Sequence, residues 1–167
     1  MIRLALASTL LAACIAPAAL AQEGQMTPVH DDVRFEARPD VSSASSWASD
    51  GQTTVINLLT EAEMEAPGFD FAASVTGNGL IYAHVPVWFS TGAEATDTVT
   101  HILAEADGPV VLMCGGAVRA SHIHAAARIR AGEITRDQLD EAYPGLDWQE
   151  SWLDRLLGET DSAESAQ

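Results

Sequence analysis

Cys114 and Arg119 are the residues whose types and spacing best suit chemistry. They stand in the stretch VVLMCGGAVRASHIHAAARIR, residues 110–130, with four residues between them. Gly115 and Gly116 allow the chain to turn tightly, so that successive backbone N–H groups can point toward one centre. The first turn of a following helix adds unpaired N–H donors and the positive end of its dipole. Such a loop binds oxyanions and favours the thiolate form of a cysteine placed within it.

Arg119 would complete an anion site, because a guanidinium can grip two oxygens of a tetrahedral anion. The simpler interpretation is that Gly-Gly is only a turn and that Cys114 is a small buried residue at a strand end. The combination of residues favours a functional anion loop over that interpretation. We therefore expect its ligands to be the loop amides and the arginine: Gly115, Gly116, Ala117, Val118 and Arg119.

Buried strand patterns alternate with helical patterns along the chain, which predicts an α/β fold with a central, mostly parallel sheet flanked by helices. In such sheets the working site lies at the carboxyl ends of the strands, and Cys114 follows a strand directly. The sequence around 68–79 is expected to be irregular, and Thr135 with Gln138 indicates a capped helix start. The other predicted elements are strands over 33–37, 53–59, 80–87 and 109–113 and helices over 42–49, 94–106, 119–131 and 147–157.

The first 21 residues have the pattern of a secretory signal peptide, with Ala19-Leu20-Ala21 as the cleavage site. An alternative is the stretch LLAAC, which resembles a lipobox and would leave a lipid anchor at Cys14. Either way we expect a periplasmic or secreted protein. No later apolar stretch approaches the ~20 residues of a membrane span. The predicted organisation is a signal peptide over 1–21, a loose segment over 22–32, one domain over 33–158 and a disordered acidic tail over 159–167.

The chain carries 24 Asp plus Glu against 8 arginines and no lysine, a formal net charge of −16. This charge would repel a phosphate backbone, so nucleic acid is not an expected partner. We expect a small anionic or phosphorylated substrate, bound by local contacts. His122 and His124 are two residues apart in a predicted helix and point to different sides, so they are poor joint metal ligands. His122, three residues after Arg119, could approach the site, but a surface position is the expectation. Neither metal nor cofactor is predicted.

The order TTVINL, IYAHVPV and VVLMCGGAVRAS resembles the beta-lactamase-hydrolase-like phosphatases. That family is a bacterial branch of the dual-specificity, cysteine-dependent protein tyrosine phosphatase superfamily. The likeness covers about residues 33–131. It implies a single-domain phosphatase-like fold that hydrolyses phosphate monoesters through a phosphocysteine intermediate. It also implies that Cys114 is the nucleophile, that Arg119 binds phosphate, and that the amides of residues 115–118 are anion ligands.

The sequence departs from the family's pattern around the loop. Ala117 replaces a glycine, which limits the positive φ available there. Ala120 replaces the hydroxyl that usually follows the arginine, with Ser121 one place late. Leu59 stands where an arginine is common, and Met113 where the wider superfamily often has histidine.

Phosphate ester hydrolysis also needs an acid to protonate the leaving oxygen. Glu94 and Asp97 are the carboxylates nearest the expected position, although both also suit the first turn of a helix. Two other interpretations stay open. A rhodanese-like sulfurtransferase would form a persulfide on Cys114 and needs no such acid. A catalytically inactive anion-binding module would keep only the loop.

Overall fold

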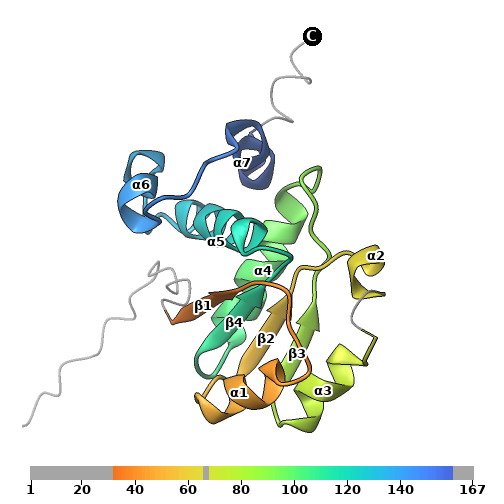
Figure 1. Ribbon diagram of the computed structural model, residues 1–167. Helices are drawn as coiled ribbons and strands as arrows, with labels where there is room; N and C mark the ends of the chain where they lie inside the picture. The colour runs from red at the N-terminus through yellow and green to blue at the C-terminus, as the bar shows by residue number, and fades with distance from the viewer. Residues whose placement is uncertain (1–31, 66–67, 160–167) are drawn as a thin grey trace, which may run out of the picture.

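The computed structural model describes residues 32–65 and 68–159. Its centre is a four-stranded sheet with the order β1-β4-β2-β3, in which every neighbouring pair is parallel (Figure 1). The strands are β1 (Val33–Glu36), β2 (Thr54–Asn57), β3 (Ile81–His84) and β4 (Val110–Met113). The predicted α/β fold with a parallel sheet is confirmed.

Helices cover both faces of this sheet, which gives three layers (Figure 1). One face packs against α1 (Ser43–Ser49) and α3 (Phe71–Gly77). The other packs against α4 (Ala93–Glu105) and α5 (Val118–Arg130), and α7 (Glu150–Leu157) packs on these two helices. The short elements are α2 (Glu61–Met64), the 3-10 helix η1 (Arg136–Gln138) and α6 (Leu139–Ala142).

The two central strands are buried on both faces, which explains their continuous apolar sequence. Successive side chains of a strand point to opposite faces. Val111 and Met113 therefore join the core beneath α1 and α3, together with Trp47. Val110 and Leu112 join the core beneath α4 and α5. Two layers of apolar contact thus fix the end of β4, where Cys114 follows.

The prediction of irregular chain around 68–79 is wrong, because residues 71–77 form α3. Asp70 caps this helix by accepting a hydrogen bond from the Ala73 amide at 2.9 Å. Phe71 and Val75 are buried against the sheet. The capping box of Thr135 and Gln138 is confirmed, although the turn it opens is a 3-10 helix.

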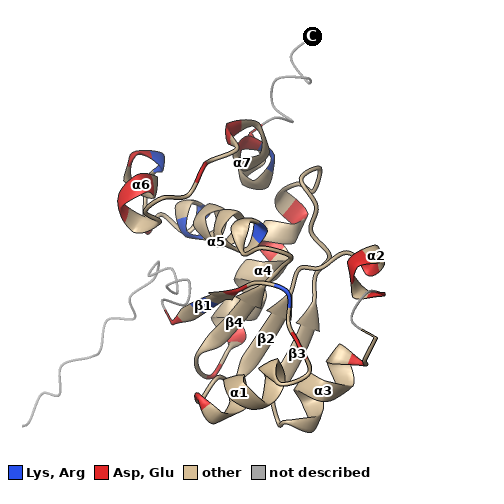
Figure 2. Ribbon diagram, in the orientation of Figure 1, with Lys and Arg blue, Asp and Glu red and all other residues tan. Residues whose placement is uncertain are grey.

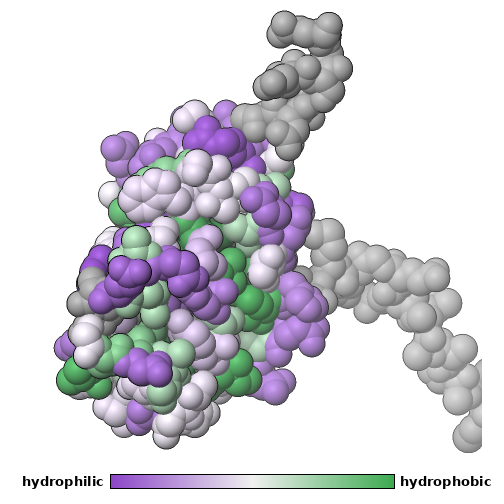
Figure 3. All heavy atoms as spheres, turned by 90° about the vertical axis from the view of Figure 1, so that its right-hand side faces the viewer, coloured by the Kyte–Doolittle hydropathy of each residue, from purple (hydrophilic) through white to green (hydrophobic). Residues whose placement is uncertain are grey.

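Acidic side chains are spread over the outer helices, with few basic ones among them (Figure 2). The side of the molecule that carries β3, one of the two edge strands of the sheet, mixes hydrophobic and hydrophilic residues (Figure 3). Within residues 32–65 and 68–159, no helix is long and apolar enough to cross a membrane. The predicted signal peptide, including Cys14, and nearly all of the predicted tail lie outside the described residues.

Candidate active site

Cys114 lies directly at the carboxyl end of β4, between β1 and β2 in the sheet. Its amide donates a hydrogen bond to the Glu36 carbonyl at 3.2 Å, so its backbone continues the ladder with β1. The residue is 1% exposed and is one of the residues that line a pocket. The pocket is lined by Arg38, Glu63, Trp88, Phe89, Cys114, Gly115, Gly116, Val118 and Arg119.

The loop after Cys114 obtains its shape from Ala117. This residue has a φ of 65°, the only positive φ of a non-glycine residue in the described chain. The expectation that alanine limits positive φ here is therefore wrong. A left-handed alanine costs about 1–2 kcal/mol, and the surrounding contacts must hold it in place.

The two glycines serve other purposes than positive φ. A Cβ on Gly115 would lie 3.0 Å from Nη2 of Arg119 and 3.1 Å from Oε1 of Glu63, so glycine makes room for this pair. Gly116 forms an isolated antiparallel bridge with Ala37, which ties the loop to the segment after β1. Part of the loop backbone thus holds the loop in place.

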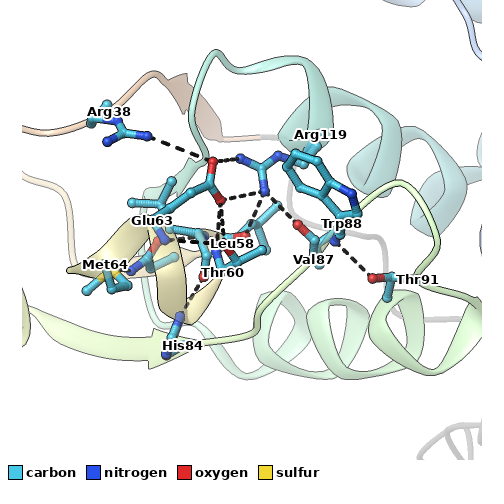
Figure 4. A network of polar contacts seen from close by, with 12 residues as sticks. Arg38, Leu58, Thr60, Glu63, Met64, His84, Val87, Trp88, Thr91 and Arg119 are labelled. Carbon is cyan, nitrogen blue, oxygen red and sulfur yellow. Dashed lines mark hydrogen bonds and ion pairs between the residues drawn. The ribbon is translucent and has the colours of Figure 1, made fainter. Parts of the chain in front are cut away.

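Arg119 is 5% exposed, and its guanidinium makes a dense set of contacts (Figure 4). Nη1 donates to Oε2 of Glu63 at 2.9 Å and to the Val87 carbonyl at 2.6 Å. Nη2 donates to Oε1 of Glu63 at 2.6 Å. The Trp88 ring lies over the guanidinium, with its centroid 5.1 Å from Cζ. Arg119 is therefore held firmly next to Gly115, in the pocket that Cys114 also lines.

Glu63, which we did not predict, is the carboxylate of this site. It stands at the third position of α2 and closes a capping box with Thr60, whose amide donates to Oε2 at 2.9 Å. The hydrogen bonds from Arg119 lower the pKa of Glu63 from 4.5 to about 2, so its carboxyl is ionised near neutral pH. The signal available in the sequence was its position after β2, the strand that pairs with β4.

Glu63 meets the guanidinium end-on, through Nη1 and Nη2. Nε makes no hydrogen bond to any residue of 32–65 or 68–159. The side formed by Nε and the second N–H of Nη2 is the other bidentate edge of an arginine. Arg119 is thus braced on one edge and retains donors for an anion on another.

The chain after β3 contributes Trp88 and Phe89 to the lining of the pocket. Trp88 is 50% exposed, and its amide is held by the Thr91 hydroxyl at 2.9 Å. Val118, at the start of α5, is 37% exposed and lines the pocket as well. These three side chains make part of the pocket lining apolar.

The structure does not bring Glu94 or Asp97 into the pocket. Both are exposed near the start of α4, and neither is among the lining residues. Asp97 instead forms an ion pair with Arg130, with 2.5 Å between Oδ1 and Nη2. Their surroundings are those of ordinary charges at the start of a helix.

His122 is fully buried, so the prediction of a surface position is wrong. α5 is covered by α4 and α7, and the imidazole packs against Trp148 and Trp152 at 4.8 and 4.9 Å between ring centroids. Its Nε2 accepts from the Gln149 amide at 3.1 Å, which places the proton on Nδ1, 2.9 Å from the Val118 carbonyl. Burial lowers the pKa of His122 and favours this neutral form.

The other departures from the family's pattern have structural roles. Leu59 and Met113 are completely buried in the core beneath α1 and α3. The Ser121 hydroxyl donates to the Ala117 carbonyl at 3.2 Å and so helps to hold the loop backbone.

His124, the second histidine of α5, is also buried, and its Nδ1 lies 2.8 Å from the Tyr143 hydroxyl.

No family model matches the chain, and no curated protein matches it. Several solved structures match the chain. A DUF442 protein from Shewanella putrefaciens CN-32 matches with a TM-score of 0.65 at 18% identity, over 83% of this chain and 92% of that one. TpbA from P. aeruginosa matches with a TM-score of 0.57 at 17% identity, over 80% and 84% of the two chains.

A third similar structure is the kinase associated phosphatase with its catalytic-site cysteine replaced by serine. Its TM-score is 0.62 at 14% identity, over 81% of this chain and 88% of that one. At identities this low, the structural matches establish the fold alone. They confirm the resemblance found in the sequence at that level: the protein has the α/β fold of the cysteine-dependent protein tyrosine phosphatases.

Proposed function

We propose that this protein is a cysteine-dependent phosphatase that hydrolyses phosphate monoesters of small molecules or phosphorylated side chains. The observation that carries the proposal is that Cys114 lines the same pocket as a buried Arg119, whose guanidinium is held by Glu63. A structural neighbour, TpbA with a cysteine-to-serine substitution, has been solved with phosphotyrosine. This supports a phosphorylated substrate for the pocket described here.

In this proposal the Cys114 thiolate attacks phosphorus and forms a phosphocysteine, which water then hydrolyses. Arg119 binds the phosphoryl oxygens through Nε and Nη2, while the loop amides of residues 115–118 contribute further donors. Glu63 holds the guanidinium in place and is a positioning residue. The alanine at 117 keeps the loop in its binding shape through its left-handed backbone.

The test is turnover of 4-nitrophenyl phosphate together with vanadate binding. Cys114→Ser is expected to abolish turnover and to retain vanadate affinity, because Arg119 and the loop amides remain. Arg119→Ala should weaken vanadate binding by about 1.5–3 kcal/mol, since a charge-assisted contact disappears. Full turnover by Cys114→Ser would leave Cys114 as only a buried thiol at a strand end. Anion binding without turnover by the unmodified protein would indicate the inactive module.

A rhodanese-like sulfurtransferase is the second candidate. The observation in its favour is that Glu63, the carboxyl residue of the pocket, is ionised and bound to Arg119. Sulfur transfer through a Cys114 persulfide does not need a protonated acid. Transfer of sulfur from thiosulfate to cyanide, lost in Cys114→Ser, would support this candidate, and its absence would exclude it.

We also propose that the protein is exported and cleaved after Ala21. The basis is the Ala19-Leu20-Ala21 pattern. The intact mass of the protein isolated from its host decides between this form and a chain that begins at a lipid-modified Cys14.

A further inference from the structure

Several residues that line the pocket are apolar or carry no acidic group. In an attack by Cys114, the leaving oxygen departs on the side of phosphorus away from the sulfur. Trp88, Phe89 and Val118, which line the pocket, have no group that could deliver a proton to that oxygen. Glu63 is ionised and bonded to Arg119 through both carboxylate oxygens. Within the described chain, no lining residue is thus a carboxyl or imidazole free to act as the acid.

Arg38 is the second cation of the pocket. It follows Ala37, whose bridge to Gly116 brings the segment after β1 against the loop. Its Nη2 lies 3.9 Å from Oε1 of Glu63, at the limit of an ion pair, and its side chain is 45% exposed (Figure 4). The same carboxylate oxygen lies 2.6 Å from Nη2 of Arg119. Glu63 is therefore committed to Arg119, and Arg38 keeps donors for another anion.

These two observations describe one kind of substrate. A leaving group that departs as a stable anion needs no proton, and a nearby guanidinium can bind its charge. We infer, building on the phosphatase function proposed above, that the pocket accepts phosphoric anhydrides, in which the phosphoryl group is attached to a second acid that Arg38 binds. Alkyl esters, whose leaving group must be protonated, fit this pocket poorly.

The reaction balances without an acid. The Cys114 sulfur forms a bond to phosphorus, and the bond between phosphorus and the bridging oxygen breaks. Its electron pair leaves with that oxygen, giving the second acid as a carboxylate or phosphate anion beside Arg38. Water then attacks the phosphocysteine, so that the P–S electrons return to sulfur. Inorganic phosphate and a proton are released.

The experiment compares kcat/KM of the purified protein for four substrates: pyrophosphate, acetyl phosphate, 4-nitrophenyl phosphate and glycerol 3-phosphate. At least one anhydride is expected to exceed glycerol 3-phosphate by about 100-fold or more, because the missing acid matters only for the ester. The preferred anhydride then identifies the second acid as phosphate or carboxylate. The same four measurements are repeated with the Arg38→Gln variant.

Arg38→Gln should lower kcat/KM for the preferred anhydride about tenfold more than for 4-nitrophenyl phosphate, which has no charged group beside the bridging oxygen. Arg34→Gln is the matched control, because Arg34 is 44% exposed on β1, pairs with Asp50 and does not line the pocket. Hydrolysis of glycerol 3-phosphate as fast as the anhydrides, or an equal effect of Arg38→Gln on all substrates, overturns the inference. No turnover of any substrate, 4-nitrophenyl phosphate included, overturns the phosphatase proposal itself and the inference with it.

Discussion

Arg119 and Glu63 meet end-on through two hydrogen bonds, from Nη2 to Oε1 at 2.6 Å and from Nη1 to Oε2 at 2.9 Å. The two residues are 56 positions apart, and each follows one of two neighbouring parallel strands. The pair fixes the plane of the guanidinium, so that Arg119 does not need to be ordered when an anion binds. Preorganisation of this kind is what an anion site needs, because the cost of ordering the arginine is met during folding.

Replacing Glu63 by glutamine should weaken the site. The amide cannot accept both hydrogen bonds and carries no charge, so Arg119 loses part of its support. We expect kcat/KM and vanadate affinity to fall about tenfold, which corresponds to one charge-assisted hydrogen bond. The matched control is Glu61→Gln on the same helix, where the side chain is 82% exposed and its Oε1 lies 3.7 Å from Nδ1 of His84. Equal effects of the two substitutions would contradict a positioning role for Glu63.

The same pair predicts how stability depends on pH. The pKa of Glu63 is about 2 in the folded protein against an ordinary 4.5, because Arg119 donates to its charged form. The stabilisation is therefore fully present above pH 4.5 and is lost as the pH falls toward 2. Thermal unfolding of the unmodified protein and of Glu63→Gln should show a gap in melting temperature that narrows over this window. A gap that stays constant would mean that the ion pair does not stabilise the fold.

The left-handed backbone of Ala117 predicts a gain in stability from glycine. Ala117→Gly removes the steric cost of a φ of 65°, and part of this gain is offset by the greater freedom of glycine in the unfolded chain. We expect the free energy of unfolding to rise by about 0.5–1 kcal/mol. Ala131→Gly, at a φ of −74° just after α5, is the control and should lower it. Denaturant unfolding measures the free energy of unfolding of both variants. A lower free energy of unfolding in Ala117→Gly would contradict a strained backbone at residue 117.

The buried His122 predicts a second pH effect at higher pH. Burial lowers its pKa below the ordinary 6.5, so the unfolded chain takes up a proton before the folded protein does. Stability should therefore decrease as the pH falls below 6.5. His122→Gln should remove this component of the pH profile, whereas His101→Gln, at an exposed position on α4, should keep it. Unfolding midpoints of the three proteins are measured between about pH 5 and 8, the range in which histidine titrates, and test this expectation.

The sequence predicts the strands, the main helices and the placement of Cys114 between β4 and α5, because these features depend on local pattern and spacing. α3 escaped prediction because a run of small and polar residues hides its two buried anchors, Phe71 and Val75. Glu63 escaped because its role comes from the pairing of β2 with β4, which brings α2 beside the loop. The spacing that suggested Glu94 and Asp97 as acids says nothing about which way α4 presents them.

The most direct test of the account is to trap the intermediate. The protein is mixed with 4-nitrophenyl phosphate, stopped in acid during turnover, digested and examined by mass spectrometry. We predict one added phosphoryl group on the peptide that carries Cys114, absent in Cys114→Ser and present in Glu63→Gln. Turnover with a phosphoryl group on another residue, or with no covalent intermediate while Cys114→Ser remains active, would contradict the assignment of Cys114 as the nucleophile.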